Sequence, residues 1–138
     1  MRLWHKDLIP VLPRQQLLGQ WRECCLIAKN ITEKGTPGHL LVNRIMDYPI
    51  EHFIDYTQRI GFEIEKRGYR CNWGLFEKYL SSTKIFPFYD ELFKNWHNTR
   101  YLKQCLYNLE EKYDCGGISA NECEIIVREY YKLLFGGE

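Results

Sequence analysis

The fold of this chain is decided by the stretch LPRQQLLGQWRECCLIAKN, residues 12–30. Pro13 suits the first position of a helix, where its missing N–H would be unpaired in any case. At about 100° per residue, one face of this helix collects apolar side chains, namely Leu17, Leu18, Trp21, Cys24, Cys25 and Ala28. We therefore predict a helix from Pro13 to about Asn30 that packs this face into a core.

The rest of the chain shows the same helical spacing of apolar residues. Apolar spacing and helix-end residues predict further helices from Pro49 to about Gly68, from Asn72 to about Leu80, from Pro87 to about His97, from about Tyr101 to Gly116, and from Ser119 to Leu134. Residues 30–38 indicate a loop, and strand alternation is nearly absent. We find no repeat and no linker, so residues 1–138 are predicted to form one compact all-α domain.

The composition excludes several classes of protein. The chain has 138 residues, of which 45% are hydrophobic, enough for the core of one domain. No apolar run approaches the roughly 20 residues that cross a bilayer, and the basic start of the chain is not followed by an apolar signal segment. We expect a cytoplasmic protein, a monomer, with no membrane partner.

The cysteines and histidines do not indicate a metal site. The six cysteines include no Cys-x-x-Cys pair, and the four histidines are dispersed. We interpret the cysteines mostly as reduced core residues and expect no metal and no cofactor. The same core assignment is made for the aromatic residues Trp4, Trp73, Trp96, Tyr130, Tyr131 and Phe135.

The net charge of +1 hides an asymmetry along the chain. The first 44 residues contain seven Lys or Arg against three Asp or Glu, whereas the other 94 contain 12 against 15. This distribution allows an anion-binding face near the N-terminus.

The outer face of the first helix is unusual for a solvated surface. It carries Gln15, Gln16, Gly19, Arg22 and Glu23. A glycine in mid-helix costs roughly 1 kcal/mol relative to alanine, and its missing side chain allows another backbone or a ligand to come close. A carboxylate beside an arginine is how a general base next to a phosphate-binding group would look. A merely solvated polar face is the alternative.

Several blocks of the sequence resemble a known family. The blocks are Arg2-Leu3-Trp4-His5, residues 12–23, His39-Leu40-Leu41-Val42-Asn43, Asp47-Tyr48-Pro49 and Glu65-Lys66-Arg67-Gly68-Tyr69. They are similar to the bacterial branch of the pyrimidine dimer DNA glycosylase/endonuclease V family, whose best-known member is a phage enzyme. The resemblance covers residues 1–73, and residues 74–138 would complete the helical domain.

The resemblance implies a DNA glycosylase with abasic-site lyase activity, acting on damaged or abasic double-stranded DNA. In that family the α-amino group of the N-terminus attacks the deoxyribose through a Schiff base, and a glutamate matching Glu23 assists. Arginines matching Arg2 and Arg22 would hold DNA phosphates or the lesion. Further candidate DNA contacts are Lys6, Arg14, Gln15, Gln16, His39 and Arg44. His39 could equally cap its own loop.

The chemistry of an N-terminal nucleophile is reasonable near neutral pH, because α-amino groups titrate at roughly 7.7 to 8.0 and lysines near 10.4. Phage-type enzymes expose a small residue after removal of the initiator methionine, but residue 2 here is Arg, whose bulk should block that removal. We therefore expect Met1 to be retained and to be the nucleophile.

Two positions depart from the family, since Gln16 replaces a histidine and Leu26 a basic residue. Fewer cationic contacts should lower the affinity for DNA and its dependence on salt. The pyrimidine dimer is therefore a weaker expectation than the abasic-site chemistry.

Two alternatives remain open from the sequence. The first is a non-catalytic helical protein that binds nucleic acid. The second is an intracellular interaction module whose aromatic residues serve a protein partner.

Overall fold

The computed structural model describes residues 1–80 and 89–136. In these residues the chain forms helices and turns and no strand, so the predicted all-α class is confirmed. The α-helices are α1 (Arg14–Lys34), α2 (Ile50–Lys66), α3 (Trp73–Glu77), α4 (Thr99–Asp114) and α5 (Ala120–Phe135), and the 3-10 helices are η1 (Lys6–Val11) and η2 (Asn43–Asp47). The two 3-10 helices have no counterpart in the sequence prediction.

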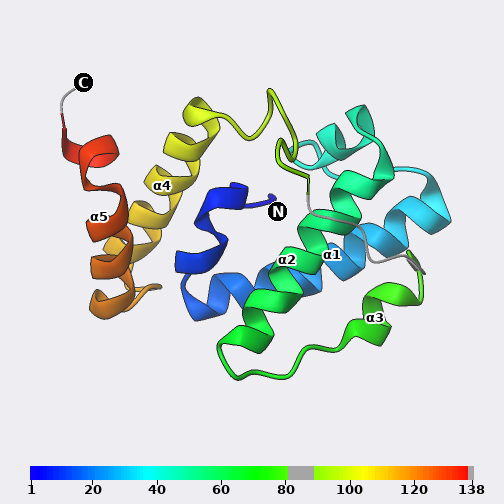
Figure 1. Cartoon of the computed structure of the whole chain (residues 1–138), viewed down its shortest axis with the longest axis horizontal. Helices are drawn as coiled ribbons and strands as arrows, with labels where there is room; N and C mark the ends of the chain where they lie inside the picture. The colour runs from blue at the N-terminus through cyan, green and yellow to red at the C-terminus, as the bar shows by residue number, and fades with distance from the viewer. Residues whose placement is uncertain (81–88, 137–138) are drawn as a thin grey trace.

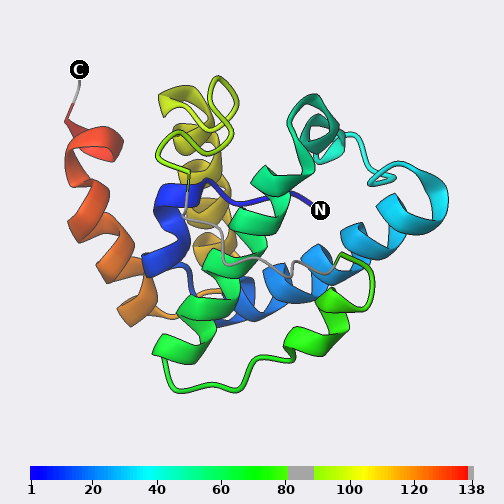
Figure 2. The ribbon, with the colours of Figure 1, turned by 45° about the vertical axis from the view of Figure 1, so that its right-hand side comes forward.

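The helices form two packed pairs, α1 with α2 and α4 with α5 (Figure 1). The short helix η1 contacts both α2 and α5, so it lies between the pairs, and the view in Figure 2 agrees. The phenol of Tyr130 on α5 strengthens this link by donating to the carbonyl oxygen of Asp7 at 2.9 Å.

Helix α1 follows the predicted pattern and then runs beyond it. Pro13 immediately precedes its first residue, and the apolar face is buried, with Leu18 half-buried. The helix continues four residues past Asn30 and ends at Gly35, whose φ of 75° is left-handed. Glycine adopts this conformation without steric cost, which explains why the helix stops there. The predicted loop 30–38 is correspondingly shorter.

Helices α2, α4 and α5 agree with the prediction within one or two residues at most ends. The hydroxyl of Ser119 accepts from the N–H of Glu122 at 3.2 Å, and the Glu122 carboxylate accepts from the N–H of Ser119. The other carboxylate oxygen of Glu122 accepts from the N–H of Arg14 at 2.8 Å. One glutamate thus caps the first turn of α5 and also binds the first turn of α1.

The predicted helix from Pro87 to His97 is wrong where the structure describes it. Its start lies outside the described residues, and residues 90–97 form turns. Phe93 and Asn95 have φ values of 53° and 72°, which no right-handed helix allows. Phe93 is instead fully buried, and its N–H donates to Nδ1 of His52 at 3.1 Å. Packing against α2 therefore overrides the local helical pattern.

Other predictions need smaller corrections. Helix α3 ends at Glu77 instead of about Leu80, and the side chain of Asn72 makes no capping hydrogen bond. Trp4 and Trp96 are buried and Trp73 is half-buried against Trp21. The core assignment is wrong for Tyr131 and Phe135, because both lie on the outward face of α5.

Three of the six cysteines are buried, as predicted for core residues, and Cys71 and Cys123 are half-buried. Cys24, Cys25 and Cys105 are buried, Cys115 is exposed, and all six thiols are free.

Candidate active site at the N-terminus

The first residues of the chain are held in place by side chains from three helices. Gln20, buried in α1, accepts from the N–H of Trp4 at 2.7 Å and donates to the carbonyl oxygen of Arg2 at 2.9 Å. Tyr56 of α2 donates to the carbonyl oxygen of Trp4 at 2.7 Å, and Tyr101 of α4 donates to that of Leu3. The N-terminus consequently lies among the helices (Figures 1 and 2).

Glu23 lies beside this anchored segment. It is one turn after Gln20 on α1, and its Oε2 is 3.5 Å from the amide nitrogen of Gln20. The same amide therefore contacts the Arg2 carbonyl oxygen and the Glu23 carboxylate. Met1 directly precedes Arg2 and is 36% exposed. The structure thus brings the backbone of Arg2 and the carboxylate of Glu23 together through Gln20, with Met1 one residue away along the chain.

A cavity of about 430 Å³ opens next to Arg2. Arg2, Arg44 of η2 and Arg100 of α4 supply its positive charge, and the described residues that line it include no Asp or Glu. The other lining residues are Leu40, Leu41, Trp96, Asn98, Tyr101 and Gln104. The Arg44 guanidinium lies over the Trp96 ring at 5.6 Å from its centroid, which holds one cation at the wall. This arrangement suits an anionic ligand.

A second basic groove runs along the outer face of α1. Its volume is about 520 Å³, and it is lined by Arg14, Gln15, Gln16, Leu18 and Arg22. Gly19 lies on this face, and a Cβ built there would meet only the Arg22 guanidinium, at 3.8 Å. No neighbouring backbone approaches Gly19 in the described residues, so its missing side chain leaves open surface.

Two of the predicted DNA-binding residues, Lys6 and His39, line neither the basic cavity nor the groove on α1. The ammonium of Lys6 pairs with the carboxylate of Asp7 at 3.2 Å. His39 is exposed, and its Nδ1 accepts from the N–H of Leu41 at 3.3 Å, so it caps its own loop. Its neighbours Leu40 and Leu41 line the cavity instead.

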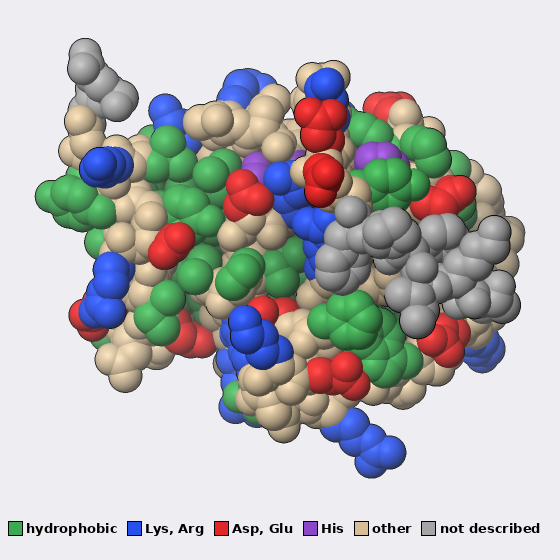
Figure 3. Space-filling view, in the orientation of Figure 1, with side chains coloured by type: hydrophobic (Ala, Val, Ile, Leu, Met, Phe, Trp, Pro, Cys, Tyr) green, Lys and Arg blue, Asp and Glu red, His purple; other side chains and the backbone are tan. Residues whose placement is uncertain are grey.

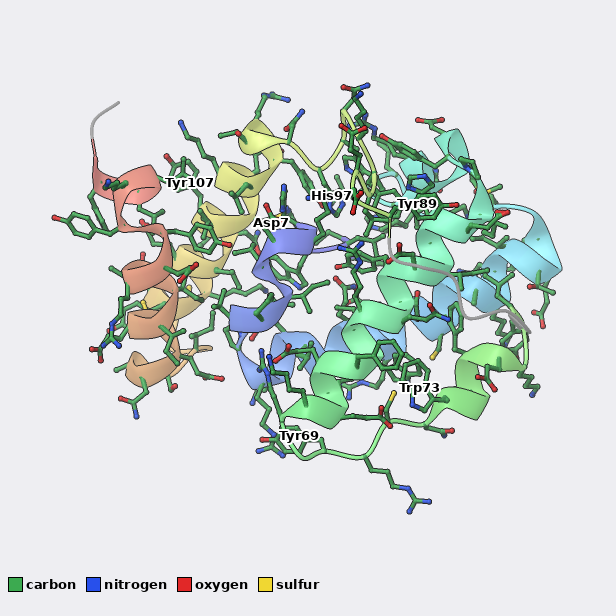
Figure 4. All side chains as sticks on the ribbon, viewed as in Figure 1. Asp7, Tyr69, Trp73, Tyr89, His97 and Tyr107 are labelled. Carbon is green, nitrogen blue, oxygen red and sulfur yellow. The ribbon has the colours of Figure 1, made fainter. Side chains whose placement is uncertain are left out.

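Two buried histidines pack against each other at the start of η1. The rings of His5 and His97 stack at 5.1 Å, and Nδ1 of His97 accepts from the N–H of Lys6 at 3.0 Å. Figure 4 shows His97 beside η1, close to Asp7. Burial lowers the pKa of His97 to about 2, so this ring is neutral near physiological pH. A neutral ring can accept the backbone hydrogen bond that orients the start of η1.

Four residues that hold the N-terminal segment or line the cavity were not predicted from the sequence, namely Gln20, Tyr56, Arg100 and Tyr101. Gln20 carried a signal, because it lies three residues after Leu17 and four before Cys24, which places a polar side chain on the apolar stripe of α1. Tyr56, Tyr101 and Arg100 carried none, since only the packing of α2 and α4 brings them to the N-terminus.

The described residues contain no group of three or more His, Cys, Asp or Glu side chains arranged to hold a metal ion. Across the same part of the chain, every helix is too short or too polar to span a bilayer.

The basic cavity beside the N-terminus suits an anionic ligand, and the phosphates of a nucleic acid are one such ligand. Residues 1–77 match the family described as pyrimidine dimer DNA glycosylase. Because this match covers more than half of the chain, the protein belongs to that family of DNA repair glycosylases. No curated protein and no solved structure gives a match.

Proposed function

We propose that this protein is a bifunctional DNA glycosylase and abasic-site lyase, acting on pyrimidine dimers or abasic sites in double-stranded DNA. The main support is the Gln20 amide, which contacts both the Arg2 carbonyl oxygen at 2.9 Å and the Glu23 carboxylate at 3.5 Å. An N-terminal amine on a free chain end would have to be ordered before it could attack. Here the residue next to it is already anchored beside a carboxylate, which reduces that entropic cost.

In the proposed reaction, the unprotonated α-amino group of Met1 bonds to C1′ of the damaged nucleotide. The bond between C1′ and the base breaks, and the base leaves C1′ with the electron pair and takes up the proton that the attacking nitrogen loses. The sugar ring then opens as the nitrogen lone pair forms an iminium between Met1 and C1′, and O4′ takes up a proton from solvent. At an abasic site, the amine condenses with the C1′ aldehyde and releases water.

The iminium draws electrons and acidifies the C2′ proton, which Glu23 removes. The C3′–O bond then breaks and the phosphate leaves, so the strand is cut by β-elimination. Water hydrolyses the iminium and restores the amine. We assign Arg2, Arg44 and Arg100 to the DNA phosphates near the lesion, and Arg14 and Arg22 to the backbone further along.

The test of Glu23 compares Glu23→Gln with wild type on duplexes that carry an abasic site or ultraviolet damage. We expect strand cleavage to fall by about 100-fold or more, because general acid–base catalysis contributes roughly 10² to 10⁴, while DNA binding is retained. Glu33→Gln, on the same helix and exposed, is the matched control. Undiminished cleavage by Glu23→Gln would remove Glu23 from the mechanism.

The same substrate tests the nucleophile. Borohydride should trap a covalent complex with abasic DNA, and peptide mapping should place the crosslink on Met1. An N-terminal extension should abolish trapping, and the same extension at the C-terminus should not. A crosslink on a lysine contradicts the assignment. Salt-dependent binding without cleavage would indicate a non-catalytic DNA-binding protein, and no binding would favour a protein-interaction module.

A further inference from the structure

An exposed leucine stands at the edge of the basic cavity. Leu40 is 84% exposed, more than any other large apolar side chain that the structure describes, and Leu41 beside it is 50% exposed. Both line the cavity that Arg2, Arg44 and Arg100 make positive. In Figures 1 and 2 the segment between α1 and η2 (cyan) lies at the edge of the molecule. Leu40 is therefore open to a large ligand.

The loop that carries Leu40 is internally braced. Oδ1 of Asn43 lies 3.3 Å from the N–H of His39 and 3.4 Å from the hydroxyl of Thr36, and accepts from both. The side chain of Asn30 donates to the carbonyl oxygen of Pro37 at 3.1 Å, which ties the loop to α1. These bonds hold the backbone around Leu40 in one conformation. The loop thus presents the leucine outward in a defined position.

We propose that Leu40 inserts into the base stack of duplex DNA beside the lesion, while Arg2, Arg44 and Arg100 hold the neighbouring phosphates. This inference rests on the proposed function. A duplex offers both complements in one ligand, because its phosphates match the arginines and the faces of its bases match the leucine. Apolar side chains inserted between base steps unstack and kink DNA. Since Arg2 follows Met1 directly, the inserted leucine would open the stack close to the attacked sugar.

The experiment uses a duplex with a tetrahydrofuran abasic-site analogue, which cannot form a Schiff base, and 2-aminopurine in the adjoining base pair. The fluorescence of 2-aminopurine rises when its stack opens. Wild type should bind and raise the fluorescence. Leu40→Ala should bind about tenfold more weakly, as expected for losing most of a buried leucine side chain, and should give no rise at saturation. Leu40→Met should restore both, because methionine replaces the apolar volume.

The matched control is Leu75→Ala, an exposed leucine on α3 that does not line the cavity. Circular dichroism of each variant monitors folding, which truncation of so exposed a side chain should leave intact. Unchanged affinity and an unchanged fluorescence rise in Leu40→Ala would overturn the inference and leave the proposed function standing, provided that abasic DNA is still cleaved. If wild type neither binds the analogue duplex nor cleaves abasic DNA, the proposed function fails as well.

Discussion

At the scale of the residue, Gln20 is the centre of the candidate site. Its oxygen accepts from the N–H of Trp4 and lies 3.0 Å from the hydroxyl oxygen of Tyr56, whose one hydrogen is shared with the carbonyl oxygen of Trp4. Its nitrogen donates to Arg2 and Glu23. A side-chain amide has two donor hydrogens and an oxygen that accepts twice, so these four contacts use its full capacity. No other neutral side chain of that length could replace it without leaving buried groups unpaired.

Replacing Gln20 should therefore reduce both stability and activity. In Gln20→Leu the N–H of Trp4 and the carbonyl oxygen of Arg2 lose their partner, and each buried unpaired group costs about 1–3 kcal/mol. We expect urea unfolding to show a loss of about 2 kcal/mol or more, and single-turnover cleavage of abasic DNA to fall. Gln58→Leu, a half-buried glutamine on α2, should change neither by a comparable amount. Wild-type stability in Gln20→Leu would show that the hydrogen bonds of Gln20 to Trp4 and Arg2 are not needed to hold the N-terminal segment.

At the scale of the element, one carboxylate joins the first and last helices. Glu122 lies in the first turn of α5 and accepts from the first N–H of α1. Burial acts against its charge, but the hydrogen bonds from Arg14 and Ser119 prevail and lower the pKa of Glu122. The contribution of the ionised group is present at neutral pH and is lost as the pH falls through that lowered pKa.

Glu122→Ala should consequently destabilise the fold. It removes a capping box and the bond to α1, and helix caps contribute roughly 0.5–2 kcal/mol each. We expect a loss of about 1–2 kcal/mol in urea unfolding at pH 7, and a smaller loss at acid pH. Glu129→Ala, on the exposed side of α5, is the control. Equal stability of the two variants would contradict a role for Glu122 in joining the helices.

The outward face of α4 and α5 is the other notable element. Tyr107, Ile125, Tyr131 and Phe135 are each more than half exposed, and Figure 3 shows apolar side chains gathered over these helices. Residues of this kind at helical spacing are usually core, which is why the sequence pattern misassigned Tyr131 and Phe135. The kink at Tyr130, whose φ is −117°, turns the last part of α5.

At the scale of the whole molecule, positive charge is concentrated at one cavity although the net charge is only +1. Arg2, Arg44 and Arg100 come from the N-terminal segment, η2 and α4, yet they line one cavity. A nearly neutral protein can thus bind a polyanion through a small positive area. On the proposed function, this predicts a small DNA footprint and a modest dependence of affinity on salt.

The salt dependence tests that footprint. Each phosphate contact changes the slope of log K against log salt by about 0.9, so Arg100→Ala should make the slope shallower by about that amount. Arg128→Ala should leave it unchanged, because Arg128 is exposed on α5 and paired with Glu124 at 2.8 Å. Fluorescence anisotropy with abasic-analogue DNA measures both. An unaltered slope in Arg100→Ala would exclude this arginine from the phosphate contacts.

Local signals along the chain were enough to predict the all-α class, both faces of the first helix and the capping box of Ser119. These features depend on residues three or four positions apart, so the sequence contains them. The resemblance of residues 1–73 likewise anticipated the family that residues 1–77 match. Arg2 and Glu23 could be named as candidates from that resemblance, but not placed together.

Their placement was decided by the tertiary structure. Gln20 reaches Arg2 across 18 positions of the chain, and Tyr101 reaches Leu3 across 98. Residues 90–97 have a helical pattern but form turns, because burial of Phe93 against α2 outweighs a local preference. Contacts at such distances depend on how the helices pack, and no spacing along the sequence records that packing.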